Sequence, residues 1–144
     1  MADTIKVLKW DPTLRRGRRA GSTDVITNVH GQNIVLAETA PAFTPLAIDA
    51  NGKAVKADKT DDAKSEVKLY SLEAGQPDDT IQAAAPGSII QGETGLTPKE
   101  RYFLGAAGAK STTAPTVDDE NVVELGTAKS ATEFIFSPQF LVKL

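Results

Sequence analysis

Short apolar runs follow one another along most of this chain, and turn-forming residues separate them. About nine such runs occur at intervals of roughly 8–12 residues, with Gly, Pro, Asn and Asp gathered between them. No helical periodicity persists beyond two turns, and the aliphatic residues needed for a core are plentiful. This spacing predicts an all-β fold, namely a small antiparallel β-sandwich or barrel.

The strand candidates lie between Asn33 and Leu144. They cover residues 34–36, 46–48, 54–57, 66–72, 80–85, 88–90, 101–104, 121–126 and 133–136. Asn51-Gly52 predicts a hairpin, because both residues tolerate positive φ. We expect the runs at 88–90 and 101–104 to pair with each other. Pro98 should lie in their connection and Pro138 should break the last run, because proline cannot donate to a central ladder.

The N-terminal segment differs from the rest of the chain in its charge. Residues 1–31 hold six Lys or Arg and three Asp or Glu, a balance of +3, whereas the other residues carry 10 basic and 16 acidic side chains, a balance of −6. Four arginines with a glycine among them do not make a core element. We therefore expect an extended basic N-terminal arm over residues 1–32, with an extended run at 5–10, and a single β domain over residues 33–144.

Three roles are open to the arginine cluster of this arm. Nucleic acid phosphates are one partner, but no Tyr or Phe stacking platform flanks the cluster and the rest of the chain is acidic. Carboxylates on another protein suit arginine better, because its guanidinium binds them through two parallel hydrogen bonds. A solubilising tail is the third role. We favour a protein partner and disfavour nucleic acid, and the binding residues we predict are Leu8, Trp10, Arg15, Arg16, Arg18 and Arg19.

The residue inventory holds little that could carry catalysis. The chain has no cysteine, which excludes disulfides and thiolate chemistry, and its one histidine, His30, lies in a turn-like context. The acidic clusters at 58–62 and 118–120 lack the spacing of a calcium loop. Three stretches imitate phosphate-binding loops but lack the required glycine and lysine together; they are residues 87–92, 105–111 and 126–130. We expect a non-enzyme without cofactor or metal.

No run of the sequence has the length of a membrane span, and the N-terminus lacks the apolar region of a secretory signal. We therefore expect no membrane association and synthesis in a cytoplasm.

Two stretches of the chain carry a resemblance to a known family. The first is Gly92-Glu-Thr-Gly-Leu-Thr-Pro-Lys-Glu-Arg-Tyr-Phe-Leu104, and the second is Val123-Glu-Leu-Gly-Thr-Ala-Lys-Ser-Ala-Thr132, after a Gly-rich turn and a Thr/Pro-rich stretch. In this order the chain resembles the head decoration (cement) proteins of tailed phages and related head-fibre modules. The resemblance covers about residues 34–137 and includes the hairpin at 47–57. Lys99-Glu100 departs from the pattern, which usually has glycine there, and the basic arm is not part of it.

The resemblance implies a viral structural protein on the outer capsid surface of a virion. Such a protein binds the major capsid protein, stabilises the shell, and assembles as a homotrimer more often than as a dimer. The rival reading is a head-fibre or adhesion module that binds host-surface carbohydrate, although one Trp and two Tyr supply few aromatic platforms. A small β-fold hydrolase is a further alternative that the residue inventory disfavours.

Overall fold

The computed structural model describes residues 31–144, and these form ten strands and no helix, which confirms the all-β prediction. The first five strands are β1 (Gly31–Val35), β2 (Pro45–Ile48), β3 (Ala54–Lys56), β4 (Leu69–Ser71) and β5 (Thr80–Ala84). The second five are β6 (Ile89–Gln91), β7 (Arg101–Leu104), β8 (Lys110–Ser111), β9 (Asn121–Ala128) and β10 (Glu133–Lys143). Every run predicted between Asn33 and Leu144 overlaps a strand, and the extended run at 5–10 lies outside the described residues. β8 was not predicted, and β1 begins ahead of Asn33, the predicted start of the β domain.

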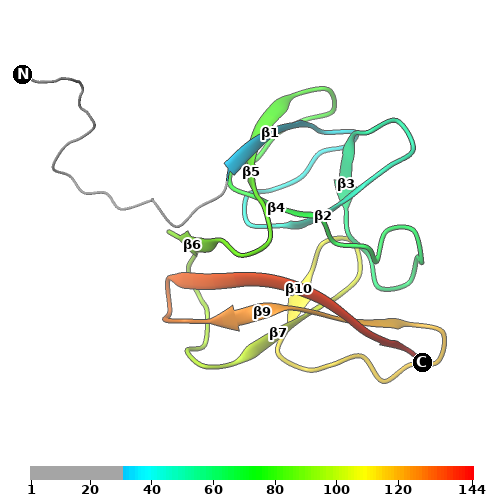
Figure 1. The fold of residues 1–144 in the computed structure, drawn as a ribbon, viewed down its shortest axis with the longest axis vertical. Helices are drawn as coiled ribbons and strands as arrows, with labels where there is room; N and C mark the ends of the chain where they lie inside the picture. The colour runs from blue at the N-terminus through cyan, green and yellow to red at the C-terminus, as the bar shows by residue number, and fades with distance from the viewer. Residues whose placement is uncertain (1–30) are drawn as a thin grey trace, which may run out of the picture.

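The strands form two five-stranded sheets, and the first has the order β1-β5-β4-β2-β3. A parallel bridge between Leu36 and Ala54 joins its two ends, so the sheet curls toward a small barrel (Figure 1). Ile81 and Ala83 on β5 alternate with exposed Thr80 and Gln82, which points the apolar pair into this barrel. The curl thereby encloses a core of its own, formed by Leu36, Ala40, Leu46, Ala54, Leu69, Ile81 and Ala83.

The central strand β4 is buried on both faces. Leu69 belongs to the core inside the curled sheet, whereas Tyr70 belongs to the core shared with the second sheet. Tyr70 is fully buried although Lys68, two residues before it, is exposed, because β4 lies in the middle of a sheet covered on both faces. The strand is shorter than the predicted run 66–72.

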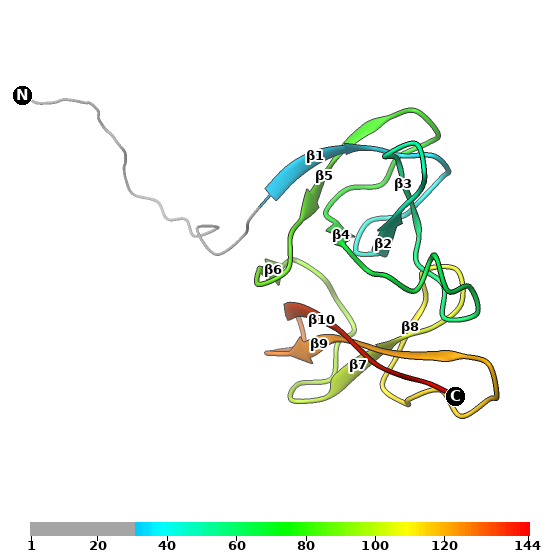
Figure 2. The same ribbon diagram turned by 45° about the vertical axis from the view of Figure 1, so that its right-hand side comes forward.

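The second sheet has the order β6-β10-β9-β7-β8 and lies below the first in both ribbon views (Figures 1 and 2). Three aromatic contacts fill the space between the sheets. The Tyr70 ring lies 5.4 Å from that of Phe134 and 5.1 Å from that of Phe136, and Tyr102 meets Phe134 edge-on at 5.8 Å. Because this core draws residues from both sheets, it holds the two layers together.

The predicted pairing of residues 88–90 with 101–104 is wrong. β6 pairs with β10, while β7 pairs with β9 and β8, so β6 and β7 lie on opposite sides of the two longest strands. β9 and β10 have eight and eleven residues and form the longest ladder, which places them in the middle of the sheet. Pro98 lies in the connection between β6 and β7, as predicted.

The prediction that Pro138 breaks the last run is wrong. β10 continues through it to Lys143, and the register against β9 shifts between Phe136 and Gln139. A β-bulge is one of the places where a strand accepts proline, because the missing N–H then costs no ladder hydrogen bond. The bulge therefore lets one long strand include both apolar runs.

Candidate interaction surface

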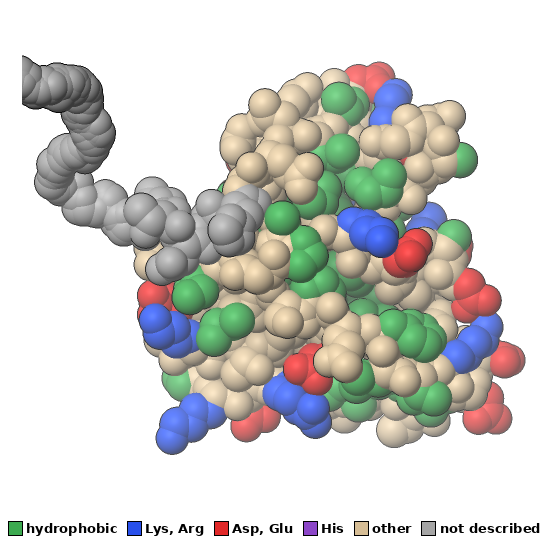
Figure 3. Space-filling view, viewed as in Figure 1, with side chains coloured by type: hydrophobic (Ala, Val, Ile, Leu, Met, Phe, Trp, Pro, Cys, Tyr) green, Lys and Arg blue, Asp and Glu red, His purple; other side chains and the backbone are tan. Residues whose placement is uncertain are grey.

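The C-terminal half of β10 exposes apolar side chains. Phe140 is 57% exposed, Leu141 42%, Val142 49% and Leu144 41%. The space-filling view shows hydrophobic side chains at the surface on the lower right, where β10 runs toward the C-terminus in Figure 1 (Figure 3). Three consecutive residues, Phe140, Leu141 and Val142, are thus exposed where the register against β9 shifts a second time, between Phe140 and Val142.

One edge of this half-strand is also free. β6 pairs with β10 only over Glu133–Ile135, and the last main-chain bonds on that edge join Phe136 to Gly87 and Ser88 at 2.8 and 2.9 Å. Within residues 31–144, no strand pairs with this edge after Phe136. The strand thus offers main-chain donors and acceptors along a row of apolar side chains, which is the template that an added strand requires.

A cavity of about 430 Å³ opens beside this edge. Apolar side chains of Val67, Val123, Pro138 and Phe140 line it together with Asp62, Ser65, Glu66 and Gln139. The carboxylates of Asp62 and Glu66 are 71% and 73% exposed. The hollow therefore combines an apolar floor with a polar rim, on which Asp62 pairs with Lys143 and Glu66 with Lys68.

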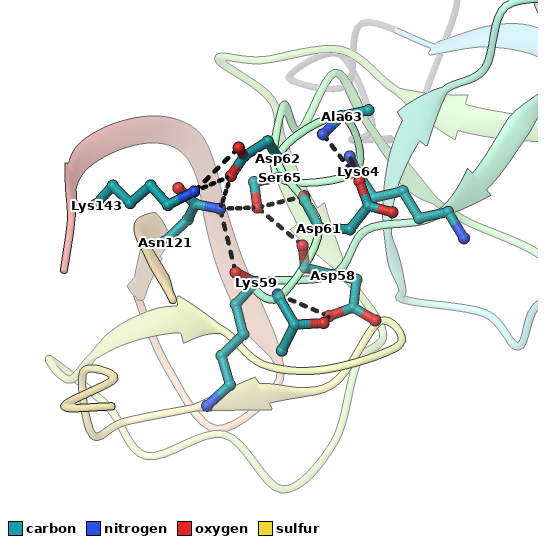
Figure 4. Close-up of polar contacts among 10 residues, drawn as sticks. Asp58, Lys59, Asp61, Asp62, Ala63, Lys64, Ser65, Asn121 and Lys143 are labelled. Atoms are coloured by element: carbon teal, nitrogen blue, oxygen red, sulfur yellow. Dashed lines mark hydrogen bonds and ion pairs between the residues drawn. The ribbon is translucent and has the colours of Figure 1, made fainter. Parts of the chain in front are cut away.

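The loop over residues 58–65 carries Asp62 and Ser65 of this rim, and hydrogen bonds hold it against the second sheet. Asn121, at the start of β9, places its Nδ2 3.0 Å from Asp62 Oδ1 and 2.9 Å from Ser65 Oγ (Figure 4). The ammonium of Lys143 lies 2.9 and 3.0 Å from the two carboxylate oxygens of Asp62. Hydrogen bonds from Asn121 and Lys143 lower the pKa of Asp62 below its ordinary value. These contacts fix the loop against the end of β10.

The acidic cluster at 58–62 acts in turn formation. Asp58 Oδ1 accepts hydrogen bonds from the main chain and hydroxyl of Thr60 at 2.9 and 2.7 Å, and Asp61 Oδ1 accepts one from Ala63 at 2.9 Å. Burial acts to raise the pKa of Asp58, but hydrogen bonds from Thr60 and Ala107 and the charge of Lys64 together lower it. Among residues 31–144, no three His, Cys, Asp or Glu side chains are grouped as metal ligands.

A polar cluster lies between the two sheets. Tyr70 donates a 2.6 Å hydrogen bond to Glu93 Oε1, and the Lys110 ammonium contacts Glu93 Oε2, the Tyr70 hydroxyl and, at 3.0 Å, the main-chain oxygen of Phe43. The side chains of Lys110 and Glu93 are only 15% and 8% exposed. Burial, and then the Glu93 carboxylate, raise the pKa of Tyr70, so its hydroxyl keeps its proton and remains a donor. Every polar group of this cluster has a partner, which indicates that the cluster has a structural role and links the two sheets.

The three stretches that imitate phosphate-binding loops contribute to this scaffold. Residues 87–92 contain β6, residues 105–111 turn into β8, and residues 126–130 end β9. None of the three opens a helix, because the part of the chain described here contains none. No described helix could cross a membrane either.

The predicted binding residues Leu8, Trp10, Arg15, Arg16, Arg18 and Arg19 lie outside the described residues, as does His30. The surface on β10 was not anticipated. Its one sequence signal is the apolar run at 140–142 beyond Pro138, and that run looks the same in a buried strand.

The sequence was also compared with known proteins. No protein-family model and no curated protein matches it.

Proposed function

We propose that this protein is a non-enzymatic structural protein of a tailed-phage virion, which binds the outer surface of the capsid and stabilises it. The observation that carries the proposal is the exposed apolar end of β10. The motif resemblance selects the shell as the partner, and the exposed strand supplies a surface of the kind that assembly uses.

The energetic argument for assembly is simple. Single exposed apolar residues are common on soluble proteins, but an exposed strand with a run of apolar side chains and a free edge is an aggregation hazard unless a partner covers it. Phe140, Leu141, Val142 and Leu144 lie in one short segment. Burying such side chains contributes roughly 1.5–3 kcal/mol each when the burial is complete, so the partner that covers this segment gains substantially.

The arm adds the second contact in this proposal. Leu8 and Trp10 supply apolar area, and Arg15, Arg16, Arg18 and Arg19 pair with carboxylates of the major capsid protein or of a neighbouring subunit. A homotrimer would present three such arms. Several weak contacts then act together, which raises the overall affinity without any single strong contact.

Binding to purified phage capsids tests the proposal. We expect the full-length protein to co-sediment with expanded capsids and not with unexpanded ones, and to raise the temperature at which the expanded shells release DNA. The double variant Phe140→Ser/Leu141→Ser should bind weakly. Its matched control is Ile48→Ser, which changes an exposed apolar residue in the other sheet. Equal binding by both variants would remove β10 from the contact, and glycan binding without capsid binding would favour the head-fibre alternative.

Deletion of residues 1–21 tests the arm separately. The β body should remain folded, as judged by an unchanged circular dichroism spectrum, while capsid binding weakens. If the truncated protein binds and stabilises capsids as well as the intact one, the arm is only a solubilising tail.

A further inference from the structure

We propose that residues 5–10 of one copy bind as an added strand along the free edge of β10 in a second copy. The proposal rests on the multimer proposed above and names the contact that builds it. It requires no capsid, so it can fail or succeed separately from capsid attachment.

The dimensions of the two segments agree. The free edge runs from Ser137 to Lys143, which is about 24 Å at 3.4 Å per residue. An extended segment over residues 5–10 spans about 20 Å by the same measure. Main-chain hydrogen bonds along such an edge give affinity, and side chains on both faces give specificity.

The side-chain patterns also agree. Residues 140–142 expose three consecutive apolar side chains beside the free edge of β10, so the incoming strand should be rich in apolar side chains. Residues 5–10 meet this condition, because Ile5 and Val7 alternate with Leu8 and Trp10 on the opposite face. Elsewhere in the described sheets, strands such as β5 alternate buried apolar and exposed polar residues, as expected for one covered face.

In this arrangement the side chain of Trp10 occupies the cavity beside the edge of β10. Its apolar lining by Val67, Val123 and Phe140 matches the indole ring, and the carboxylates of Asp62 and Glu66 on its rim can accept the indole N–H. Both carboxylates pair with lysines of the body, Asp62 with Lys143 and Glu66 with Lys68, so the attraction for the basic arm rests on net charge. A partner with +3 in residues 1–31 thus meets a body whose remaining residues carry −6.

The length of chain allows a second copy to be the source of the arm. Residues 11–30 can span about 66–72 Å when extended, so the arm can reach a neighbouring molecule from β1. A contact between the arm of one copy and β10 of the next is heterologous, and such contacts give a ring such as a trimer when the rotation between copies closes. Direct pairing of two β10 edges would instead give a two-fold dimer and would bring two acidic bodies together.

Disulfide cross-linking of the full-length chain tests this contact, because the protein has no cysteine of its own. Val7→Cys and Leu141→Cys proteins are mixed without capsids, oxidised, and examined by non-reducing electrophoresis. We expect a covalent two-chain product in the mixture, and none when Leu141→Cys is replaced by the control Ala50→Cys, an exposed position in the turn between β2 and β3. A product from Leu141→Cys alone, in amounts that the mixture does not exceed, would mean β10-to-β10 pairing and would overturn the proposal.

Two other results would also overturn it. The first is the absence of any covalent product. The second concerns a chain that carries both Val7→Cys and Leu141→Cys: a cross-link that forms only within such single chains would mean that the arm binds its own β10. A second readout uses Trp10, the only tryptophan in the chain. Its emission should shift to the blue as protein concentration rises, and Phe140→Ser should raise the concentration at which the shift occurs by about tenfold or more.

Discussion

The buried pair of Lys110 and Glu93 permits a quantitative prediction about how the two sheets are held together. Lys110→Met removes the ammonium that contacts both Glu93 and Tyr70, while preserving an unbranched side chain of similar length. Glu93 then keeps only the hydrogen bond from Tyr70, at 2.6 Å. We expect the variant to remain folded but to be clearly less stable than the parent protein.

The magnitude follows from the burial of the pair. Removing one partner of a fully buried ion pair costs about 3–5 kcal/mol, because a charge is left without compensation in a poorly hydrated site. The side chains here are 15% and 8% exposed, so water can reach the pair in part and the lower end applies, about 3 kcal/mol. For a domain of this size, that loss lowers Tm by roughly 10 °C.

Urea unfolding of the parent, Lys110→Met, Glu93→Gln and the double variant measures this effect. Each single change should cost about 3 kcal/mol, and the double variant should cost less than their sum by about 1–3 kcal/mol, because the second change removes the group left unpaired by the first. Single losses under about 1 kcal/mol with simple additivity would refute the reasoning, since that is how a solvent-screened surface pair behaves.

Three further predictions concern the second sheet. Phe103 is only 6% exposed, so Phe103→Ala should lower the free energy of unfolding by about 3–4 kcal/mol in the same assay, and a loss near zero would contradict its burial. A Cβ on Gly126 would lie 1.9 Å from the main-chain oxygen of Ile135, so Gly126→Ala should cost at least about 3 kcal/mol, whereas Gly87→Ala, which meets no atom within 4 Å, should cost about 1 kcal/mol. Hydrogen bonds from Asn121 and Lys143 lower the pKa of Asp62, so their stabilising effect is present above about pH 4 and is lost as the pH falls through the folded-state pKa. Lys143→Met should therefore reduce the drop in Tm on acidification, and an unchanged pH profile would contradict this.

The positions of the strands could be predicted from the sequence, because they depend on local patterns. Turn residues such as Asn51-Gly52 correctly place a hairpin, and β2 and β3 pair across it. The partners of the other strands could not be predicted in the same way. A turn-rich connection separates β6 from β7, as in a hairpin. The longer ladder of β9 and β10 nevertheless lies between them in the sheet, and no pattern near residues 88–104 indicates this strand order.

The candidate surface depends on information that no local pattern holds. The apolar run at 140–142 indicates a strand, but its exposure depends on where β6 stops and on the absence of a further strand among the residues described. The buried contacts among Tyr70, Glu93 and Lys110 could not be predicted for a similar reason. Glu93 and Lys110 each look like a surface charge next to a glycine-rich turn, and only the packing of the two sheets brings them to Tyr70.

The order of the strands along the chain has a consequence for biosynthesis. All strands of the first sheet lie before residue 85, and all strands of the second lie after residue 88. On the ribosome, the curled first sheet can therefore close around its own small core before the end of the second sheet, β10, has emerged. Tyr70 would lie on the outer face of this intermediate. Phe134 and Phe136 are among the last residues to emerge, and the second sheet packs against the first when they contact Tyr70.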